Sequence, residues 1–429
     1  MYSFALLNLI GVFIAFVIVI VLIRRQFDFG LSLITGSLII GLFSLPSIGV
    51  WGIVRAIIEA TIYSFEEGAL ATQTLELAVL MTLIYMLAKM MQNTKAIAKL
   101  INSLRTFFSK GGTIGVVPAI YGLMPVPGGA LFSAPVVKEE GDEFNINVNK
   151  KNFFNIWFRH VWFPIYPISS NVIILCSLAA IDMPSLILAN FLSFVVMIDI
   201  GYVLLTLFVY NGNKKVKKDD VSKSKKDYTG LVYILPPIVP LMFAIFYFMF
   251  KIPLIRCFIA GVFFSIALLL FLTKTDRRDY KKLLKKSFTW KLAVVIAGIM
   301  IFREMFEASG ANVSIFELIK GLPIPAVLMV VLLPVVLGLV TGYLLCAITL
   351  SYPLLEPFLQ DIGLTKVGFT SLIFMSAFVG YIISPIHLCN VLSSKYLKTD
   401  TTRMYHIFIP SALLLLAFHI LIIYILFHI

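Results

Sequence analysis

Long runs of hydrophobic residues, separated by short polar segments, fill the chain from one end to the other. Ten of these runs are candidates for membrane-spanning helices, five in each half. They cover residues 4–23, 29–44, 70–91, 153–180 and 184–209, and then 230–249, 252–273, 290–307, 366–395 and 405–427. The pattern predicts an all-α polytopic membrane protein with two repeats, residues 1–209 and 230–429, joined by a Lys-rich linker at residues 210–229.

A further hydrophobic segment lies between the third and fourth span of each half, at residues 113–137 and 324–354. Each has Gly with Pro or Thr near its centre. A limb of about 12 to 14 residues at 1.5 Å per residue reaches only ~18–21 Å, which is less than the ~30 Å thickness of the hydrocarbon core. Each segment is therefore predicted to be a re-entrant hairpin. Mixed apolar and charged segments at 51–65, 93–108 and 310–320 are predicted to be interfacial helices.

The fourth span of each half is interrupted by Pro near its middle. The sequence PIYPISSN breaks the first at residues 164–171, and SPIHLCN breaks the second at residues 384–390. Paired breaks in corresponding segments indicate the binding site of a secondary transporter, because bare backbone at membrane depth is tolerated only where it lines a cavity.

The charge pattern predicts the orientation of the spans. The chain of 429 residues is 60% hydrophobic and 13% charged, and its net charge of +13 comes from basic residues in loops. This distribution follows the positive-inside rule and does not indicate a nucleic-acid partner. It predicts an integral protein of the cell (inner) membrane with a cytoplasmic linker. Five crossings per half then place both termini outside and make the two repeats inverted relative to each other.

The hairpin tips and the helix breaks supply the candidate site. The N-terminal end of a helix presents N–H groups and the positive end of its dipole to an anion. Small polar side chains there can bind substrate oxygens or sodium, and an intramembrane His can donate to an anion or relay protons. The residues predicted to bind substrate or ion are Pro127, Gly128, Gly129, Ser133, Ser169, Ser170, Asn171, Thr341, Gly342, Ser384, Pro385, His387 and Asn390.

Ionisable residues within spans are expensive to bury and are therefore functional candidates. Asp199 in the fifth span is the candidate for binding the coupling ion. Arg159, about five residues before the first break, could instead neutralise a substrate carboxylate. The four Cys residues show no CxxC spacing and no clustered His nearby, so no cofactor and no metal beyond a possible sodium ion is predicted.

Two stretches resemble the signatures of a known family. MPVPGGALFSAP at residues 124–135 and SPIHLC at residues 384–389 look like those of domain-of-unknown-function family 401, within the ion transporter superfamily. Its relatives include gluconate permeases and citrate and C4-dicarboxylate carriers. The resemblance implies a homodimer whose transport domain, carrying both hairpins and both broken helices, moves as an elevator. The Ser-Asn-Thr triplets of the dicarboxylate carriers are missing from both tips, so the resemblance does not supply a dicarboxylate substrate.

These observations predict a secondary active transporter in the lipid bilayer for a small organic anion, a carboxylate or sugar acid, coupled to sodium or protons. The alternative is a cation/proton antiporter, for which Asp199 would be indispensable. An enzyme is not predicted, because the chain has no intramembrane Asp pair, HExxH or GxSxG. A channel would need a continuous polar stripe or a ring of like charges, and neither is evident.

Overall fold

The computed structural model describes residues 2–65, 68–107, 110–123, 129–212, 228–274, 277–320 and 325–428. Within these residues the sheet structure is limited to a small hairpin of β1 (Tyr63–Ser64) and β2 (Ala69–Leu70), and nearly everything else is helix. Six helices of this part are long and apolar enough to cross a membrane. The chain is therefore an all-α protein of the membrane-embedded type. The six segments are Leu6–Arg24, Thr72–Asn93, Met183–Val209, Thr229–Phe250, Leu254–Leu272 and Thr402–Leu426.

Most predicted spans are helices with nearly the predicted bounds. The segment predicted at 230–249 is helical but not continuous, since it consists of the 3-10 helix η2 (Thr229–Ile234), α11 (Leu235–Phe243) and α12 (Ile245–Phe250). Three Pro residues in this segment remove backbone donors. The other unbroken spans are α1 (Tyr2–Arg24), α2 (Phe29–Phe43), α4 (Thr72–Asn93), α10 (Met183–Gly212), α13 (Leu254–Leu272), α15 (Lys291–Ala308) and α21 (Thr401–Leu426).

At the positions of the predicted hairpins and breaks the structure has pairs of short helices. Each hairpin consists of two helices in contact, and each broken span consists of two helices separated by a Pro-containing segment. Proline cannot donate the backbone hydrogen bond that a continuous helix needs, which explains the breaks. The hairpins are α6 (Lys110–Gly122) with α7 (Ala130–Glu143) and α17 (Ala326–Thr341) with α18 (Leu344–Leu355), followed by the short helix η3 (Glu356–Leu359). The broken spans are α8 (Val148–Arg159) with α9 (Ser170–Ala179) and α19 (Lys366–Ile382) with α20 (Leu388–Leu397).

The three amphipathic segments are also helical. They form α3 (Leu45–Thr61), α5 (Ala96–Phe107) and α16 (Ala311–Lys320). An additional basic helix, α14 (Arg277–Ser287), is not among the predicted elements. Its Leu283 and Leu284 are half-buried while the flanking Lys residues are exposed. The helix therefore packs on the protein through a short apolar stripe and exposes its charged side chains.

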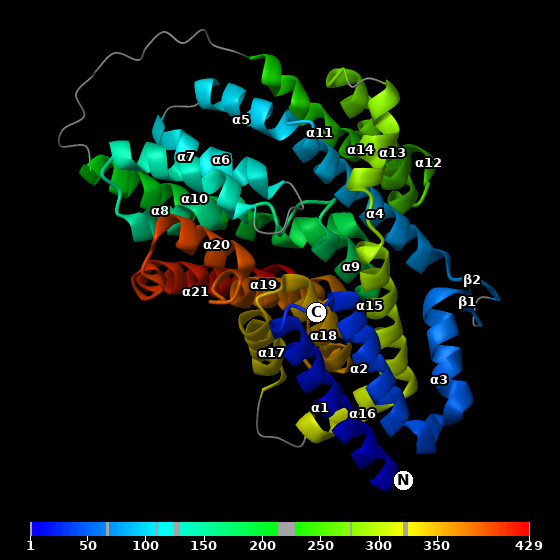
Figure 1. The fold of residues 1–429 in the computed structure, drawn as a ribbon. Coiled ribbons are helices and arrows are strands. Elements are labelled where there is room, and N and C mark those ends of the chain that lie inside the picture. The colour runs from blue at the N-terminus through cyan, green and yellow to red at the C-terminus, as the bar shows by residue number, and fades with distance from the viewer. Residues whose placement is uncertain are drawn as a thin grey trace.

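The helices pack in two groups, and each group combines elements of both halves of the chain. In the first packing group (α1–α5 and α11–α16), α2, α3 and α4 lie against α13 and α15. In the second packing group (α6–α10 and α17–α21), α20 packs on α7 and α8, and α10 packs on α19 and α21. Figure 1 shows α2, α3 and α15 on one side of the molecule and α8, α10, α20 and α21 on the other.

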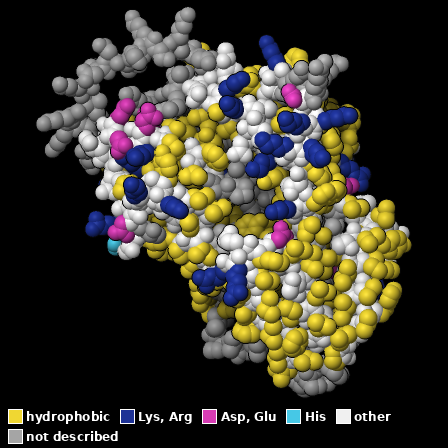
Figure 2. Space-filling view, viewed as in Figure 1, with side chains coloured by type: hydrophobic (Ala, Val, Ile, Leu, Met, Phe, Trp, Pro, Cys, Tyr) yellow, Lys and Arg dark blue, Asp and Glu magenta, His cyan; other side chains and the backbone are white. Residues whose placement is uncertain are grey.

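The outer surface suits a hydrocarbon environment. Large side chains such as Phe13, Trp51 and Phe271 are 71%, 67% and 78% exposed. Figure 2 shows hydrophobic side chains covering the lower right of this face, the part that holds α1, α2 and α3 in Figure 1, while Lys and Arg side chains gather in the upper half. Exposed apolar surface on this scale is unfavourable in water and favourable in a bilayer.

Two glycines allow α17 and α19 to pack closely. A Cβ at Gly380 would collide with the carbonyl group of Val335, and a Cβ at Gly338 would lie 2.5 Å from the carbonyl oxygen of Ala377. Because these neighbouring atoms are backbone, they cannot rotate away. We expect Gly380→Ala to lower the free energy of unfolding by about 1–3 kcal/mol, measured as reduced thermal stability in detergent.

Gly111→Ala is the matched control for this variant, because the atoms nearest to its added Cβ lie at 3.7–3.9 Å, which is ordinary contact. Alanine also favours the helical state of α6, so this control should be neutral or slightly stabilising. Equal melting temperatures for Gly380→Ala and the unmodified protein would show that α17 and α19 can separate at little cost.

Candidate functional site

One cavity brings together the broken elements of both halves. Its volume is about 450 Å³. The second packing group contributes the end of α8, the start of α9, the tip between α17 and α18, and the start of α20. The first packing group contributes the connection from α1 to α2 together with residues of α4 and α15. The cavity therefore lies between the two packing groups.

Three helices whose N-termini lack a side-chain cap begin at the wall of this cavity, beside α2, which Asp28 caps. The N-cap residues of α9, α18 and α20 are Ser169, Tyr343 and His387, and none of them caps its helix through a side-chain hydrogen bond. The first N–H groups of a helix have no partner within the helix, and they carry the positive end of its dipole. Three such ends at one cavity favour an anion over a cation. The first two residues of each helix, all lining the cavity, are Ser170, Asn171, Leu344, Leu345, Leu388 and Cys389.

Arg159 adds a full positive charge to this wall. Arg159 is only 2% exposed, and its Nη1 donates a hydrogen bond of 2.6 Å to the carbonyl oxygen of Tyr121 at the end of α6. Gly129, at the N-cap of α7, lies against the guanidinium so closely that a Cβ there would collide with it. Among the cavity-lining residues that the structure describes, Arg159 is the one Lys or Arg. The Arg159 side chain therefore both contacts the first hairpin and gives the cavity wall its positive charge.

Imidazole and phenol rings lie beside this charge. The ring centroid of His387 is 4.1 Å from that of Tyr381 and 4.9 Å from that of His160. His160 Nδ1 lies 2.7 Å from the carbonyl oxygen of Ile156, so Nδ1 carries the proton and donates it. His160 Nε2 is then an acceptor, 3.3 Å from the hydroxyl of Tyr381.

The tip of the second hairpin packs on the second break. Gly342 has the left-handed φ of +60°, and a Cβ there would lie 2.9 Å from the backbone nitrogen of His387. Thr341 donates its hydroxyl to the carbonyl oxygen of Leu337, and Ser384 donates its hydroxyl to that of Leu339. Both hydroxyls therefore satisfy backbone groups near the tip, while Thr341 and Gly342 also line the cavity.

Several predicted site residues lie away from the cavity wall. Asp199 is exposed on α10, and Pro385 is exposed within the second break. Ser169 is half-buried and its hydroxyl lies 3.4 Å from Asn171 Nδ2. Pro127 and Gly128 lie outside the described residues. Neither Asp199, Pro385 nor Ser169 is among the described lining residues.

Ser133 and Asn390 belong to a buried polar network behind the cavity. Ser133 donates its hydroxyl to Asn155 Oδ1, and Asn155 Nδ2 donates to the carbonyl oxygen of Ala130 and to Ser393 Oγ, both at 2.8 Å. Ser393 in turn donates to Asn152 Oδ1. Asn152 Nδ2 donates to Ser394 Oγ, and Ser394 donates to Asn390 Oδ1. Asn390 Nδ2 then donates to the hydroxyl of Tyr405 on α21 at 3.1 Å. The network joins the first hairpin to the helix that begins at the second break.

Most lining residues were not among the predicted site residues, and three of them carry polar or ionisable groups of interest. Asp28, between α1 and α2, is the one carboxylate among the described lining residues; as N-cap of α2 it accepts from the backbone N–H of Leu31. Tyr381 comes from α19, and Cys389 is the second residue of α20. The signal for Cys389 is its position directly after the break. Asp28 and Tyr381 carry no comparable local signal.

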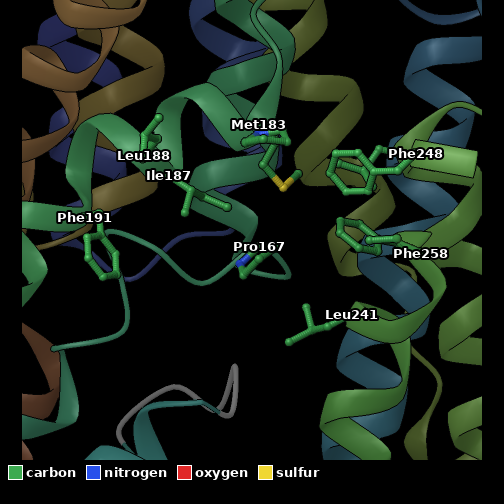
Figure 3. A pocket seen from close by; sticks show the side chains of 11 residues that line it. Pro167, Met183, Ile187, Leu188, Phe191, Leu241, Phe248 and Phe258 are labelled. Carbon is green, nitrogen blue, oxygen red and sulfur yellow. The ribbon is translucent and has the colours of Figure 1, made fainter. Parts of the chain in front are cut away.

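A second cavity has a different character. It has a volume of about 340 Å³ and its lining side chains are all apolar. Figure 3 shows Pro167, Met183, Ile187, Leu188 and Phe191 facing Leu241, Phe248 and Phe258. Its walls come from the first break and α10 on one side and from α11, α12 and α13 on the other. This cavity offers no side chain to an anion, so the charged cavity is the candidate site.

The fold and the cavity define an all-α membrane protein with a positively polarised cavity between two packing groups. Comparison with protein families matches residues 5–426 to the family described as "Protein of unknown function (DUF401)". Because this match spans nearly the whole chain, the chain belongs to that family, as the sequence predicted. A comparison with curated proteins finds no match.

Proposed function

We propose that the protein is a secondary active transporter of a small organic anion, a carboxylate or sugar acid, coupled to sodium or protons. The observation that carries the proposal is the convergence of three helix N-termini and Arg159 on one cavity. Each helix end contributes about 0.3–1 kcal/mol toward an anion, and up to about 2 kcal/mol in buried geometry. A carboxylate can accept from backbone N–H groups and from the guanidinium together.

The arrangement also supports alternating access. The cavity lies between the two packing groups, so sliding of one group against the other would move the wall that carries Arg159 and the breaks. The proposed movement is the elevator movement that the resemblance to the ion transporter superfamily implies, in a homodimer, with the two repeats inverted as the odd number of crossings per half predicts. Under the positive-inside orientation, the Arg24 and Arg25 loop that leads into Asp28 faces the cytoplasm, so the cavity opens inward in an inner-membrane protein with external termini.

A cation/proton antiporter is the second candidate, and Asp28 is the observation that favours it. Its half-buried carboxylate lines the cavity and could exchange a proton for a cation. Asp199, the coupling residue predicted from the sequence, is exposed on α10. Under the antiporter, Asp28→Asn would abolish exchange, whereas under anion transport it would leave anion binding intact.

The first test is thermal stabilisation of the purified protein by mono-, di- and tricarboxylates and sugar acids, each with and without sodium. A ligand at 100 times its Kd stabilises the folded state by about 2.7 kcal/mol. A sodium-dependent shift with one anion supports the transporter and names its substrate. A shift with sodium or pH alone favours the antiporter. Uptake into proteoliposomes under an imposed gradient then tests transport itself.

Asn171→Ala is expected to weaken binding of that anion roughly 10- to 150-fold. The variant loses one hydrogen bond to a charged group, which contributes about 1.5–3 kcal/mol. Asn171 is the second residue of α9 and lines the cavity. The measurement is the concentration dependence of the thermal shift. Asn93→Ala serves as control, because Asn93 ends α4 away from the described lining residues. Unchanged affinity in Asn171→Ala would place the ligand elsewhere in the cavity.

A further inference from the structure

We propose that His160, His387 and Cys389 form a binding site for a thiophilic metal ion, and that the preferred ion is Zn²⁺. The three residues come from opposite halves of the chain, yet their candidate ligand atoms all lie within 4.8 Å of one another. They are 0%, 1% and 5% exposed. Among the described residues, this is the one group of three or more His, Cys, Asp or Glu side chains close enough together to hold a metal ion.

The donor set determines which ion fits. Two imidazole nitrogens and one thiolate suit Zn²⁺, whereas sodium, magnesium and calcium prefer oxygen ligands. In a tetrahedral zinc site with bonds of about 2.0–2.3 Å, the ligand atoms are separated by roughly 3.3–3.7 Å. The candidate ligand atoms lie at most 4.8 Å apart in the present structure, so binding of the ion would draw them together by no more than about 1.5 Å.

His160 is oriented as metal-binding His residues usually are. Its Nδ1 donates to the carbonyl oxygen of Ile156 at 2.7 Å, which leaves the Nε2 lone pair directed away from its own helix. Such a hydrogen bond to a carbonyl group fixes the tautomer and the ring orientation of a ligand. Tyr381, whose hydroxyl lies 3.3 Å from Nε2, occupies that lone pair when no metal is bound.

His387 provides the independent observation that points to a ligand. Both of its ring nitrogens are buried, and neither has a nitrogen or oxygen hydrogen-bond partner among the described residues; the ring interacts with the thiol of Cys389. Leaving a buried polar atom without a strong partner is unfavourable, so two such atoms in one ring favour a group that is bound there. His387 and Cys389 both line the charged cavity.

Three protein ligands leave one coordination position of a tetrahedral ion open, which is the arrangement of zinc sites that bind a further molecule. Because His387 and Cys389 line the cavity, this position would face it. Zn²⁺ with one thiolate retains a single net positive charge. A carboxylate oxygen could fill the position and neutralise that charge; this last step rests on the proposed function, whereas metal binding itself does not.

The experiment titrates Co²⁺, a spectroscopic substitute for Zn²⁺, into metal-free full-length protein in detergent, without any organic anion. We expect one equivalent to give a thiolate-to-cobalt charge-transfer band, which added Zn²⁺ removes. Cys389→Ser should abolish the band. His387→Gln or His160→Gln removes a ligand and should weaken cobalt binding by more than the roughly 10- to 100-fold that loss of a ligand's outer-shell partner costs.

Cys257→Ser is the matched control, because Cys257 is also buried but lies on α13, where its thiol donates to the carbonyl oxygen of Ile252. It should keep the full band. The absence of a band in the unmodified protein overturns the proposal, and so does its persistence in Cys389→Ser. The titration of the unmodified protein tests for thiolate-bound metal even if a variant fails to fold. Failure of anion transport with the cobalt band intact would refute the transporter alone.

Discussion

Arg159→Gln is expected to weaken binding of the organic anion by roughly 30-fold to several thousand-fold. Removing one partner of a buried, hydrogen-bonded charge pair costs about 2–5 kcal/mol. Arg159 is the one cationic side chain among the described lining residues, so no neighbouring Lys or Arg can replace it. Glutamine is shorter than arginine by two bonds, so the variant also loses the hydrogen bond from Arg159 Nη1 to the carbonyl oxygen of Tyr121. The measurement is the anion concentration needed for thermal stabilisation.

Two further variants give this prediction its controls. Arg159→Lys keeps the charge but loses the planar fork that binds a carboxylate through two hydrogen bonds, so an intermediate affinity is expected. Arg256→Gln removes an Arg whose side chain is 56% exposed and pairs with Glu76 at 2.8 Å, and it should bind the anion normally. An Arg159→Gln protein that is folded and binds with unchanged affinity would exclude Arg159 from the site.

Asn155→Leu is expected to lower the free energy of unfolding by about 2–4 kcal/mol. Asn155 is fully buried and exchanges hydrogen bonds with Ser133, Ser393 and the carbonyl oxygen of Ala130. Leucine has the same number and branching of side-chain heavy atoms but leaves these partners without their bonds, and each buried unsatisfied group costs about 1–3 kcal/mol. Chemical or thermal unfolding in detergent measures the loss.

The matched control for the network is Asn93→Leu. Asn93 is half-buried and makes one side-chain hydrogen bond, to Ser287 Oγ at 3.2 Å, so its replacement should cost about 0.5–1.5 kcal/mol. Because the network joins α7 to α20, Asn155→Leu should also loosen the first hairpin, which limited proteolysis between α6 and α7 can detect. Equal stability losses in the two variants would show that the network contributes nothing beyond a single bond.

Local patterns predicted most of the architecture. Hydrophobic runs predicted the spans, and Pro residues near the middle of two runs predicted the breaks between α8 and α9 and between α19 and α20. The same breaks predicted Ser170, Asn171 and His387, which line the cavity. Two elements were less well predicted. Proline divides the segment at 229–250, and the density of Lys in α14 obscured its short apolar stripe.

The sequence by itself determined which segments are helices, where they break and how charge is distributed along them. These properties depend on near neighbours, since helix periodicity, proline and hydrophobic length act over a few residues. Only the tertiary structure decided that Arg159 faces the same cavity as three helix N-termini, and that His160 meets His387 and Cys389. Those juxtapositions join opposite halves of the chain, and they follow from how the two packing groups are assembled, which no local pattern records.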